Sequence, residues 1–178
     1  MVVILLRHTT PDVPPGTCYG QTDLPLADSF EAEAMRVMEV LPSVTRIVSS
    51  PLQRCRRLAE RVADHRQLPM TCETDLQEMD FGRWEGLLWD NIPRKEIDAW
   101  AADFLHARPH GGETVATLRA RTRRALSRWA SADETTLFVT HSGVIRAALA
   151  TGDTGEDFNT QIEFGGMIEM PIEKGIVR

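Results

Sequence analysis

The chain lacks the features that mark several large classes of protein. Its three cysteines, Cys18, Cys55 and Cys72, include no CxxC pair, which argues against a disulfide framework or a thiolate zinc site, so we expect reduced thiols. No stretch of about 18 apolar residues occurs, so no membrane span is expected. The apolar run Val2–Leu6 is too short for the core of a signal peptide. We therefore expect a cytoplasmic protein without a membrane partner.

The chain also contains fewer basic than acidic residues. The 20 Lys and Arg residues face 26 Asp and Glu residues, which gives a formal net charge of −6. Nucleic acids and anionic membranes usually demand a basic surface, so neither is expected as the main partner. An anionic ligand must instead meet a local group of arginines. Residues 54–61 and 119–124 are rich in arginine, although we expect most of these side chains to lie on solvated helix faces.

The pattern along the 178 residues predicts one globular domain spanning residues 1–178. Apolar runs bounded by turn residues predict strands at Val2–Leu6, Arg46–Ser49 and Leu137–Thr140, and a weaker one at Pro69–Cys72. Helical patterns lie between them, at Phe30–Leu41, Pro51–His65, residues 115–129 and Ser142–Ala150. We expect Asp28 or Ser29 to cap the first helix and Pro51 to begin the second.

Strands that alternate with helices imply right-handed crossovers, so the predicted fold is α/β: a three-layer α/β/α sandwich around a mainly parallel sheet. Ligands of such folds bind beyond the carboxyl ends of the strands. His8 and His141 each follow a predicted strand, and Arg54 lies in the first turn of the helix after the second strand. Residues 79–112, rich in tryptophan and polar residues, are predicted to form loops and short helices that roof this edge.

These side chains suit phosphoryl transfer to an imidazole. Guanidinium groups such as Arg7 and Arg54 can fix a phosphate ester through paired hydrogen bonds. Neutral imidazole is an effective nucleophile near pH 7, so His8 would attack phosphorus while His141 donates to the equatorial oxygens. Glu78, beside aromatic residues, would protonate the leaving alkoxide and then activate water. A lone histidine or loop carboxylate is more often structural, so the prediction depends on the combination. It requires no metal and no other cofactor.

Four segments carry a family resemblance. They are "LLRHTTP", "SSPLQRCRRLAE", "LQEMDFGRWEGL" and "VTHSGVIRAAL", in this order along Val2 to Leu149. Together they resemble the histidine phosphatase, or phosphoglycerate mutase-like, superfamily. The resemblance implies a metal-independent phosphomonoesterase with a phosphohistidine intermediate on His8 and Glu78 as acid and base. It also implies a phosphate pocket formed by Arg7, Arg54 and His141, with a further phosphate contact at Ser142.

A further segment resembles one particular branch of this superfamily. Residues 16–26, "GTCYGQTDLPL", are similar to the α-ribazole phosphatase branch, which acts in the assembly of the cobalamin nucleotide loop. This implies hydrolysis of α-ribazole 5′-phosphate or adenosylcobalamin 5′-phosphate, with a substrate-binding loop at Tyr19, Gly20, Gln21 and Thr22. A simple turn explains Gln21 and Thr22 equally well, and we expect Asp23 to bond its own backbone there.

Two positions depart from the superfamily pattern. Thr9 stands where a glycine usually follows the first histidine, and Pro14 stands where many members have an asparagine that contacts phosphate. Thr9 and Thr10 are candidates for the hydroxyl donor that replaces this asparagine.

Several functions other than net hydrolysis through a phosphohistidine are also compatible with parts of the sequence. A phosphoglycerate mutase-type phosphotransferase would share the same pocket, but the segment between Glu78 and His141 is short for a mutase, and a broad-specificity phosphatase would also share it. Cys55 and Arg61 have the C-x5-R spacing of cysteine phosphatases, although residues 56–60 contain no glycine. Metal-dependent hydrolysis and a non-catalytic phospholigand-binding module also stay open. The segment 163–172 is predicted to form an edge strand, which leaves a homodimer open.

Overall fold

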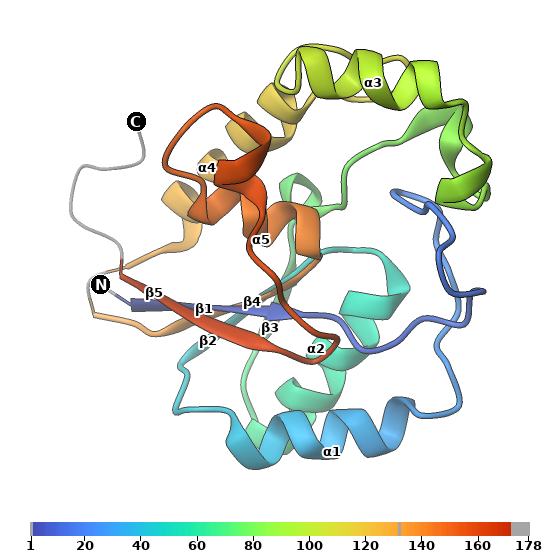
Figure 1. The fold of residues 1–178 in the computed structure, drawn as a ribbon. Helices are drawn as coiled ribbons and strands as arrows, with labels where there is room; N and C mark the ends of the chain where they lie inside the picture. The colour runs from blue at the N-terminus through green and yellow to red at the C-terminus, as the bar shows by residue number, and fades with distance from the viewer. Residues whose placement is uncertain (1, 132, 172–178) are drawn as a thin grey trace.

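A five-stranded sheet forms the centre of the computed structural model, which describes residues 2–131 and 133–171 (Figure 1). The strands are β1 (Val2–Arg7), β2 (Arg46–Ser49), β3 (Met70–Cys72), β4 (Thr136–Thr140) and β5 (Met167–Pro171), in the spatial order β3-β2-β4-β1-β5. The first four are parallel, and β5 pairs antiparallel with β1 at one edge. The predicted strands are confirmed, including the edge position of β5. Ile172, the last residue of that predicted segment, lies outside the described residues.

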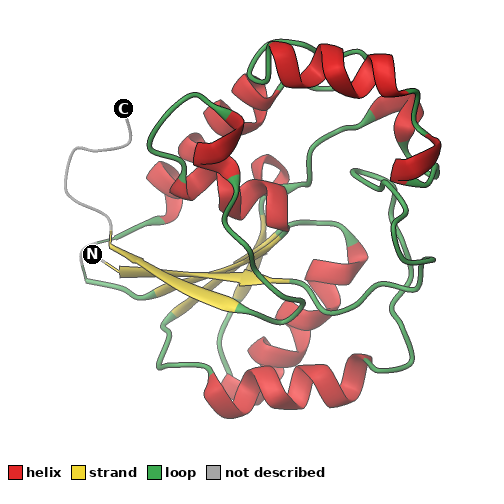
Figure 2. Cartoon of the chain, in the orientation of Figure 1, coloured by secondary structure: helices red, strands yellow, loops and turns green. Residues whose placement is uncertain are grey.

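Helices cover both faces of the sheet, which confirms the three-layer α/β/α prediction (Figures 1 and 2). One layer contains α1 (Phe30–Val40) and α2 (Gln53–Arg66), and the other contains α4 (Val115–Trp129) and α5 (Ser142–Leu149). In β1, Ile4 and Leu6 face the first layer while Val3 and Leu5 face the second. This alternation follows from the two-residue period of a strand. It explains why the run is apolar at consecutive positions.

Residues 79–112 contain loops and short helices, as predicted. These helices are η2 (Gly82–Trp84), η3 (Trp89–Asn91) and α3 (Arg94–Ala102). Two further short helices are η1 (Thr74–Leu76), which follows β3, and η4 (Gly155–Phe158), which precedes β5. Phe81, Trp84, Trp100 and His110 pack edge to face within residues 79–112. Of the described helices, none has the length and apolar character that a membrane span requires.

The start of α2 differs from its prediction. The helix begins at Gln53, and Pro51 lies in the preceding turn. The Oδ1 atom of Asp23 accepts a hydrogen bond from the Gln53 N–H at 2.7 Å, so a distant segment supplies the cap of this helix. Asp23 therefore does not bond its own backbone, and that prediction was wrong. A sequence window around either residue contains no sign of this contact.

The start of α1 also differs in detail. Ser29 occupies the N-cap position but makes no capping bond, because its hydroxyl donates to Oε1 of Glu33 at 2.6 Å. The second carboxylate oxygen of Glu33 accepts from the Thr10 N–H at 2.9 Å. Glu33 thereby ties α1 to the loop that follows β1.

The cap on α2 yields a stability prediction. Asp23→Ala should lower the free energy of unfolding by about 1 kcal/mol, the usual value of an N-cap carboxylate, as measured by urea denaturation. Asp28→Ala is the matched control, because Asp28 is an exposed carboxylate before α1 and takes no part in capping α2. Equal unfolding midpoints for Asp23→Ala and the unaltered protein would contradict the assignment.

Candidate active site

The two predicted histidines meet because β1 and β4 are adjacent and parallel. Arg7 pairs in register with Thr140, the last residue of β4, so the following residues His8 and His141 leave the sheet at the same edge. The centroids of their rings are 5.2 Å apart. The prediction that both imidazoles gather at the carboxyl end of the sheet is therefore confirmed.

The surroundings of His8 determine which ring nitrogen carries a proton. Its Nδ1 atom lies 2.7 Å from the carbonyl oxygen of Thr9. A carbonyl only accepts hydrogen bonds, so Nδ1 carries the hydrogen and Nε2 keeps its lone pair. Burial lowers the pKa of His8 well below its ordinary value, and the charge of Arg54 lowers it further. His8 is thus a neutral imidazole with a free lone pair on Nε2.

His141 is fully buried beside two small side chains that the sequence analysis did not place there. Its Nε2 atom lies 2.8 Å from Oγ of Ser50 and 3.4 Å from Sγ of Cys55. Burial is the main cause that lowers the pKa of His141, followed by the charge of Arg54. The ring is therefore neutral and held in one orientation.

Cys55 does not have the surroundings of a nucleophile. Burial raises the pKa of its thiol, which donates to the carbonyl oxygen of Thr140 at 3.3 Å. Arg61, the other member of the C-x5-R spacing, pairs with Glu31 on the surface at 3.1 Å. The geometry opposes a cysteine phosphatase mechanism.

The two predicted phosphate-binding arginines are held by carbonyl groups. The guanidinium of Arg54 donates to the carbonyl oxygens of Thr22 and Gly20 at 2.8 and 2.6 Å. Arg7 donates through Nη1 to the carbonyl oxygen of Ile162 at 2.6 Å. Within residues 2–131 and 133–171 neither arginine forms a salt bridge, and each has a buried Nε without a partner. Their positive charge is therefore uncompensated, which favours an anion.

Glu78 is anchored by the backbone of α5. Its Oε2 atom accepts from the N–H of Gly143 at 3.1 Å, and its Oε1 atom accepts from the N–H of Met79 at 2.9 Å. A Cβ atom on Gly143 would lie 2.2 Å from Oε1 of Glu78. Only glycine therefore permits this approach of the carboxylate to the first turn of α5.

A buried guanidinium group fixes the backbone that carries Glu78. Arg121 of α4 donates to the carbonyl oxygens of Asp75, Gln77 and Glu78, and it pairs with Glu113 at 2.7 Å. Arg121 is thus an exception to the expectation that the arginine-rich stretches are solvated. Its i+3 spacing from the core residue Leu118 was the available sign.

One cavity of about 720 Å³ opens onto these groups. Among the predicted site residues, five line it: Arg7, His8, Tyr19, Glu78 and Ser142. Arg54 and His141 are fully buried directly behind it. Of the two threonines proposed as donors, Thr10 lines the cavity, whereas Thr9 is fully buried and its hydroxyl has no partner.

The predicted substrate-binding loop holds the guanidinium group of Arg54 through its backbone carbonyl groups. Glu85 accepts hydrogen bonds from the backbone of Gln21 and Thr22, which aims the carbonyl groups of residues 20 and 22 at Arg54. The side-chain amide of Gln21 donates to the carbonyl oxygen of Glu78 at 3.3 Å. Gly20, Gln21 and Thr22 do not line the cavity, and their contact with substrate stays a prediction.

Several supporting residues were not predicted from the sequence: Ser50, Glu85, Arg121 and Phe164. Ser50 and Glu85 lie within the segments that carry the family resemblance, but neither residue type indicates a role there by itself. Across the described ranges, no three His, Cys, Asp or Glu side chains gather as a metal-binding group.

The neutral histidines make stability depend on pH. In the unfolded chain a histidine takes up a proton below about pH 6.5, whereas burial opposes this for His8, His141 and His110 in the fold. Their contribution is therefore complete above about pH 6.5 and is lost as the pH falls below it, by up to about 1.4 kcal/mol per pH unit for each group. Urea unfolding between about pH 7.5 and 5 should show this slope.

His141→Asn should reduce that slope by up to about 1.4 kcal/mol per pH unit, the value for one proton, because the variant removes one buried group that resists protonation. His106→Asn is the control, since His106 is exposed. An unchanged slope in His141→Asn would show that His141 titrates in the fold as it does in the unfolded chain.

Comparison with known proteins agrees with this geometry. The model of the histidine phosphatase superfamily (branch 1) matches residues 3–162. The glucosyl-3-phosphoglycerate phosphatase of Mycobacterium tuberculosis H37Rv is 32% identical over 165 residues, which cover 83% of this chain and 73% of that protein. The adenosylcobalamin/alpha-ribazole phosphatase of Escherichia coli K12 is 29% identical over 142 residues, which cover 76% of this chain and 70% of that protein.

A solved structure agrees as well. The alpha-ribazole phosphatase from Shigella flexneri superposes with a TM-score of 0.83 at 25% identity, over 98% of this chain and 92% of that one. The matched range includes all five predicted catalytic residues, which are Arg7, His8, Arg54, Glu78 and His141. The chain therefore belongs to branch 1 of the histidine phosphatase superfamily and is a phosphomonoesterase of that family.

Proposed function

We propose that this phosphatase forms a phosphohistidine on His8 and that its substrate is α-ribazole 5′-phosphate, or adenosylcobalamin 5′-phosphate with the same nucleotide. The observation that carries the choice of substrate is the aromatic wall of the cavity beyond the phosphate-binding groups. The mechanism follows from the tautomer of His8 and from the uncompensated charge of the two arginines.

In the first step, the phosphoryl group binds between Arg7, Arg54 and His141. The lone pair of Nε2 of His8 forms a bond to phosphorus as the ester P–O bond breaks. The leaving oxygen takes a proton from the carboxyl group of Glu78. The carbonyl oxygen of Thr9 supports this step, because its hydrogen bond to Nδ1 stabilises the positive charge that develops on the ring.

In the second step, water attacks phosphorus and displaces Nε2 of His8. The carboxylate of Glu78 accepts the proton of this water, so inorganic phosphate leaves and the enzyme returns to its starting state. The Gly143 N–H that holds Glu78 lies in the first turn of α5, where backbone N–H groups also favour the phosphate. Glu78 lines the same cavity as His8, and the presence of this acid supports hydrolysis over simple phospholigand binding.

The leaving group would occupy an aromatic part of the cavity. Its lining includes the aromatic side chains Tyr19, Phe81, Trp89, Trp100, Phe104, Phe158 and Phe164. Flat rings stack well against such walls. A sugar with many hydroxyl groups would lose hydration there without gaining enough polar partners. The benzimidazole base of α-ribazole suits this lining.

One cation favours a second candidate. Arg146 of α5 lines the cavity, and its Nε donates to the carbonyl oxygen of Thr160 at 2.9 Å. It pairs with no carboxylate in the described part of the chain. Its free guanidinium edge suits a carboxylate on the substrate. This observation favours glucosyl-3-phosphoglycerate, the substrate in the name of the mycobacterial relative.

The proposed nucleophile and acid can be tested separately. His8→Ala should abolish hydrolysis of p-nitrophenyl phosphate and acid-labile labelling by a phosphate donor. Glu78→Gln should lower kcat by about 10²- to 10⁴-fold, the usual contribution of a general acid, while inorganic phosphate still binds. Cys55→Ser is the control and should retain turnover. Loss of turnover in Cys55→Ser together with its survival in His8→Ala would contradict the histidine mechanism.

The substrate can be tested by comparing kcat/KM for four compounds: α-ribazole 5′-phosphate, glucosyl-3-phosphoglycerate, 3-phosphoglycerate and β-glycerol phosphate. We expect α-ribazole 5′-phosphate to exceed the others by at least about tenfold, since one well-stacked ring contributes on the order of 1.4 kcal/mol. Trp100→Leu should reduce this preference, and Arg146→Met should leave it unchanged. Faster hydrolysis of glucosyl-3-phosphoglycerate, lost in Arg146→Met, would favour the second candidate instead.

A further inference from the structure

Both phosphate-binding arginines face an aromatic ring. The Cζ atom of Arg7 lies 3.8 Å from the centroid of the Phe164 ring, and the Cζ atom of Arg54 lies 5.3 Å from that of Tyr19. The imidazole of His8 lies near both rings, with centroid distances of 5.5 Å to Phe164 and 6.5 Å to Tyr19. The closer pair, Arg7 and Phe164, has the geometry of a cation–π interaction.

A ring face suits an arginine that must bind an anion. A carboxylate would hold the guanidinium but would also cancel its charge and occupy its N–H groups. The π face attracts the cation from above its plane, so the N–H groups that point outward in the plane stay available. In Arg7, the carbonyl oxygen of Ile162 occupies Nη1 while Nε has no partner. The remaining donors can therefore serve the phosphoryl group.

The segment between η4 and β5 keeps this ring in place. The Gly165 N–H donates to the carbonyl oxygen of His8 at 3.1 Å, and the Arg7 N–H donates to that of Gly166 at 3.0 Å. Gly165 adopts φ = +70°, a conformation that favours glycine. The backbone on the C-terminal side of Phe164 is thus bonded to the two residues that the ring covers.

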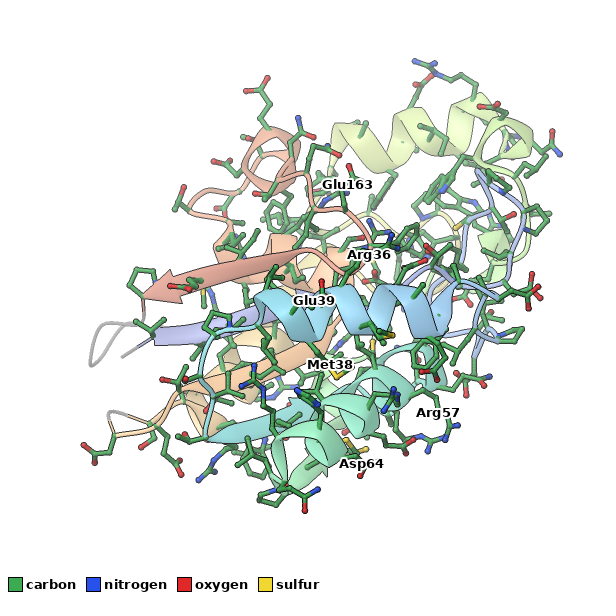
Figure 3. The ribbon with its side chains drawn as sticks, turned by 90° about the horizontal axis from the view of Figure 1, so that it is seen from below. Arg36, Met38, Glu39, Arg57, Asp64 and Glu163 are labelled. Carbon is green, nitrogen blue, oxygen red and sulfur yellow. The ribbon has the colours of Figure 1, made fainter. Side chains whose placement is uncertain are left out.

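Core packing does not force the ring onto Arg7. Phe164 is 36% exposed, and it separates the catalytic cavity from a second hollow of about 650 Å³. That hollow is lined by charged side chains that include Arg36 and Glu39 of α1 and Glu163, which are labelled in Figure 3. Hollows border the ring on both sides, and of its two described side-chain neighbours Arg7, at 3.8 Å, lies closer to the ring centroid than His8, at 5.5 Å.

We propose that Phe164 is a positioning residue that orients Arg7 for phosphate through the π face of its ring. The proposal rests on the proposed function only in giving Arg7 the role of binding the phosphoryl group, and it holds for either candidate leaving group. Removal of the Phe164 ring should therefore weaken the binding of every phosphate-like ligand by the same factor.

The test measures binding of inorganic phosphate by calorimetry and inhibition by orthovanadate. Phe164→Leu keeps an apolar side chain but removes the π face, so Kd and Ki should rise about 3- to 30-fold, the range of a partly buried cation–π interaction. KM for p-nitrophenyl phosphate should rise by a similar factor, with a smaller change in kcat. Phe164→Tyr, which keeps the ring, should restore both values.

Phe104→Leu is the matched control. Phe104 lines the same cavity, but its ring contacts Trp100 and Phe158 rather than Arg7, so phosphate binding should not change. If Phe164→Leu does not fold, replacement of Phe164 by increasingly fluorinated phenylalanines keeps the shape and should weaken binding progressively. Unchanged phosphate affinity in these variants, or equal losses in Phe104→Leu, would overturn the proposal. Because calorimetry does not depend on turnover, this result is distinct from failure of the His8 mechanism.

Discussion

Positive charge without a compensating carboxylate is the constraint on which this site depends. Arg7 and Arg54 are held by carbonyl groups and lie beside the rings of Phe164 and Tyr19, and in the described part of the chain neither forms a salt bridge. Burying such charges is costly unless a ligand returns the lost interactions. The same charges disfavour protonation of the neighbouring imidazoles. One arrangement of charges thus keeps the imidazole of His8 neutral and attracts an anion.

The fold maintains this arrangement through contacts between distant segments. Glu85 fixes the loop whose carbonyl groups hold Arg54, and Arg121 fixes the backbone that carries Glu78. The loop between η4 and β5 bonds to the residues at the end of β1. Each support is a charged or backbone group outside the cavity. These supports hold the candidate catalytic side chains in place and leave Arg7 and Arg54 without a salt bridge in the described part of the chain.

The sequence permitted prediction of where the candidate catalytic groups lie, because local patterns determine their positions. A buried strand followed by "RH" and a second strand followed by "HS" place two histidines at one sheet edge once the sheet is parallel, since the edge is common to all its strands. Arg54 follows in the same way from its place in the first turn of α2. The aromatic character of residues 79–112 likewise predicted a roof over the site.

The supporting contacts could not be predicted, for a physical reason. The cap of α2 comes from Asp23, 30 residues away, and the ring on Arg7 comes from Phe164, whose neighbours in sequence carry no catalytic pattern. Such contacts depend on the exact path of loops, which hydrophobic periodicity does not encode. Arg121 is a partial exception, because its position on the buried face of α4 distinguishes it from the other arginines of that helix.

The arrangement of charges requires that the resting protein hold His8 neutral, with its proton on Nδ1. Nitrogen-15 NMR of selectively labelled histidine, assigned with His8→Ala, measures this protonation state. We predict that His8 shows a protonated Nδ1 and an unprotonated Nε2 from about pH 6 to pH 8, since burial and two guanidinium groups oppose a second proton. An imidazolium signal for His8 at pH 7, or a proton on Nε2, would contradict the account.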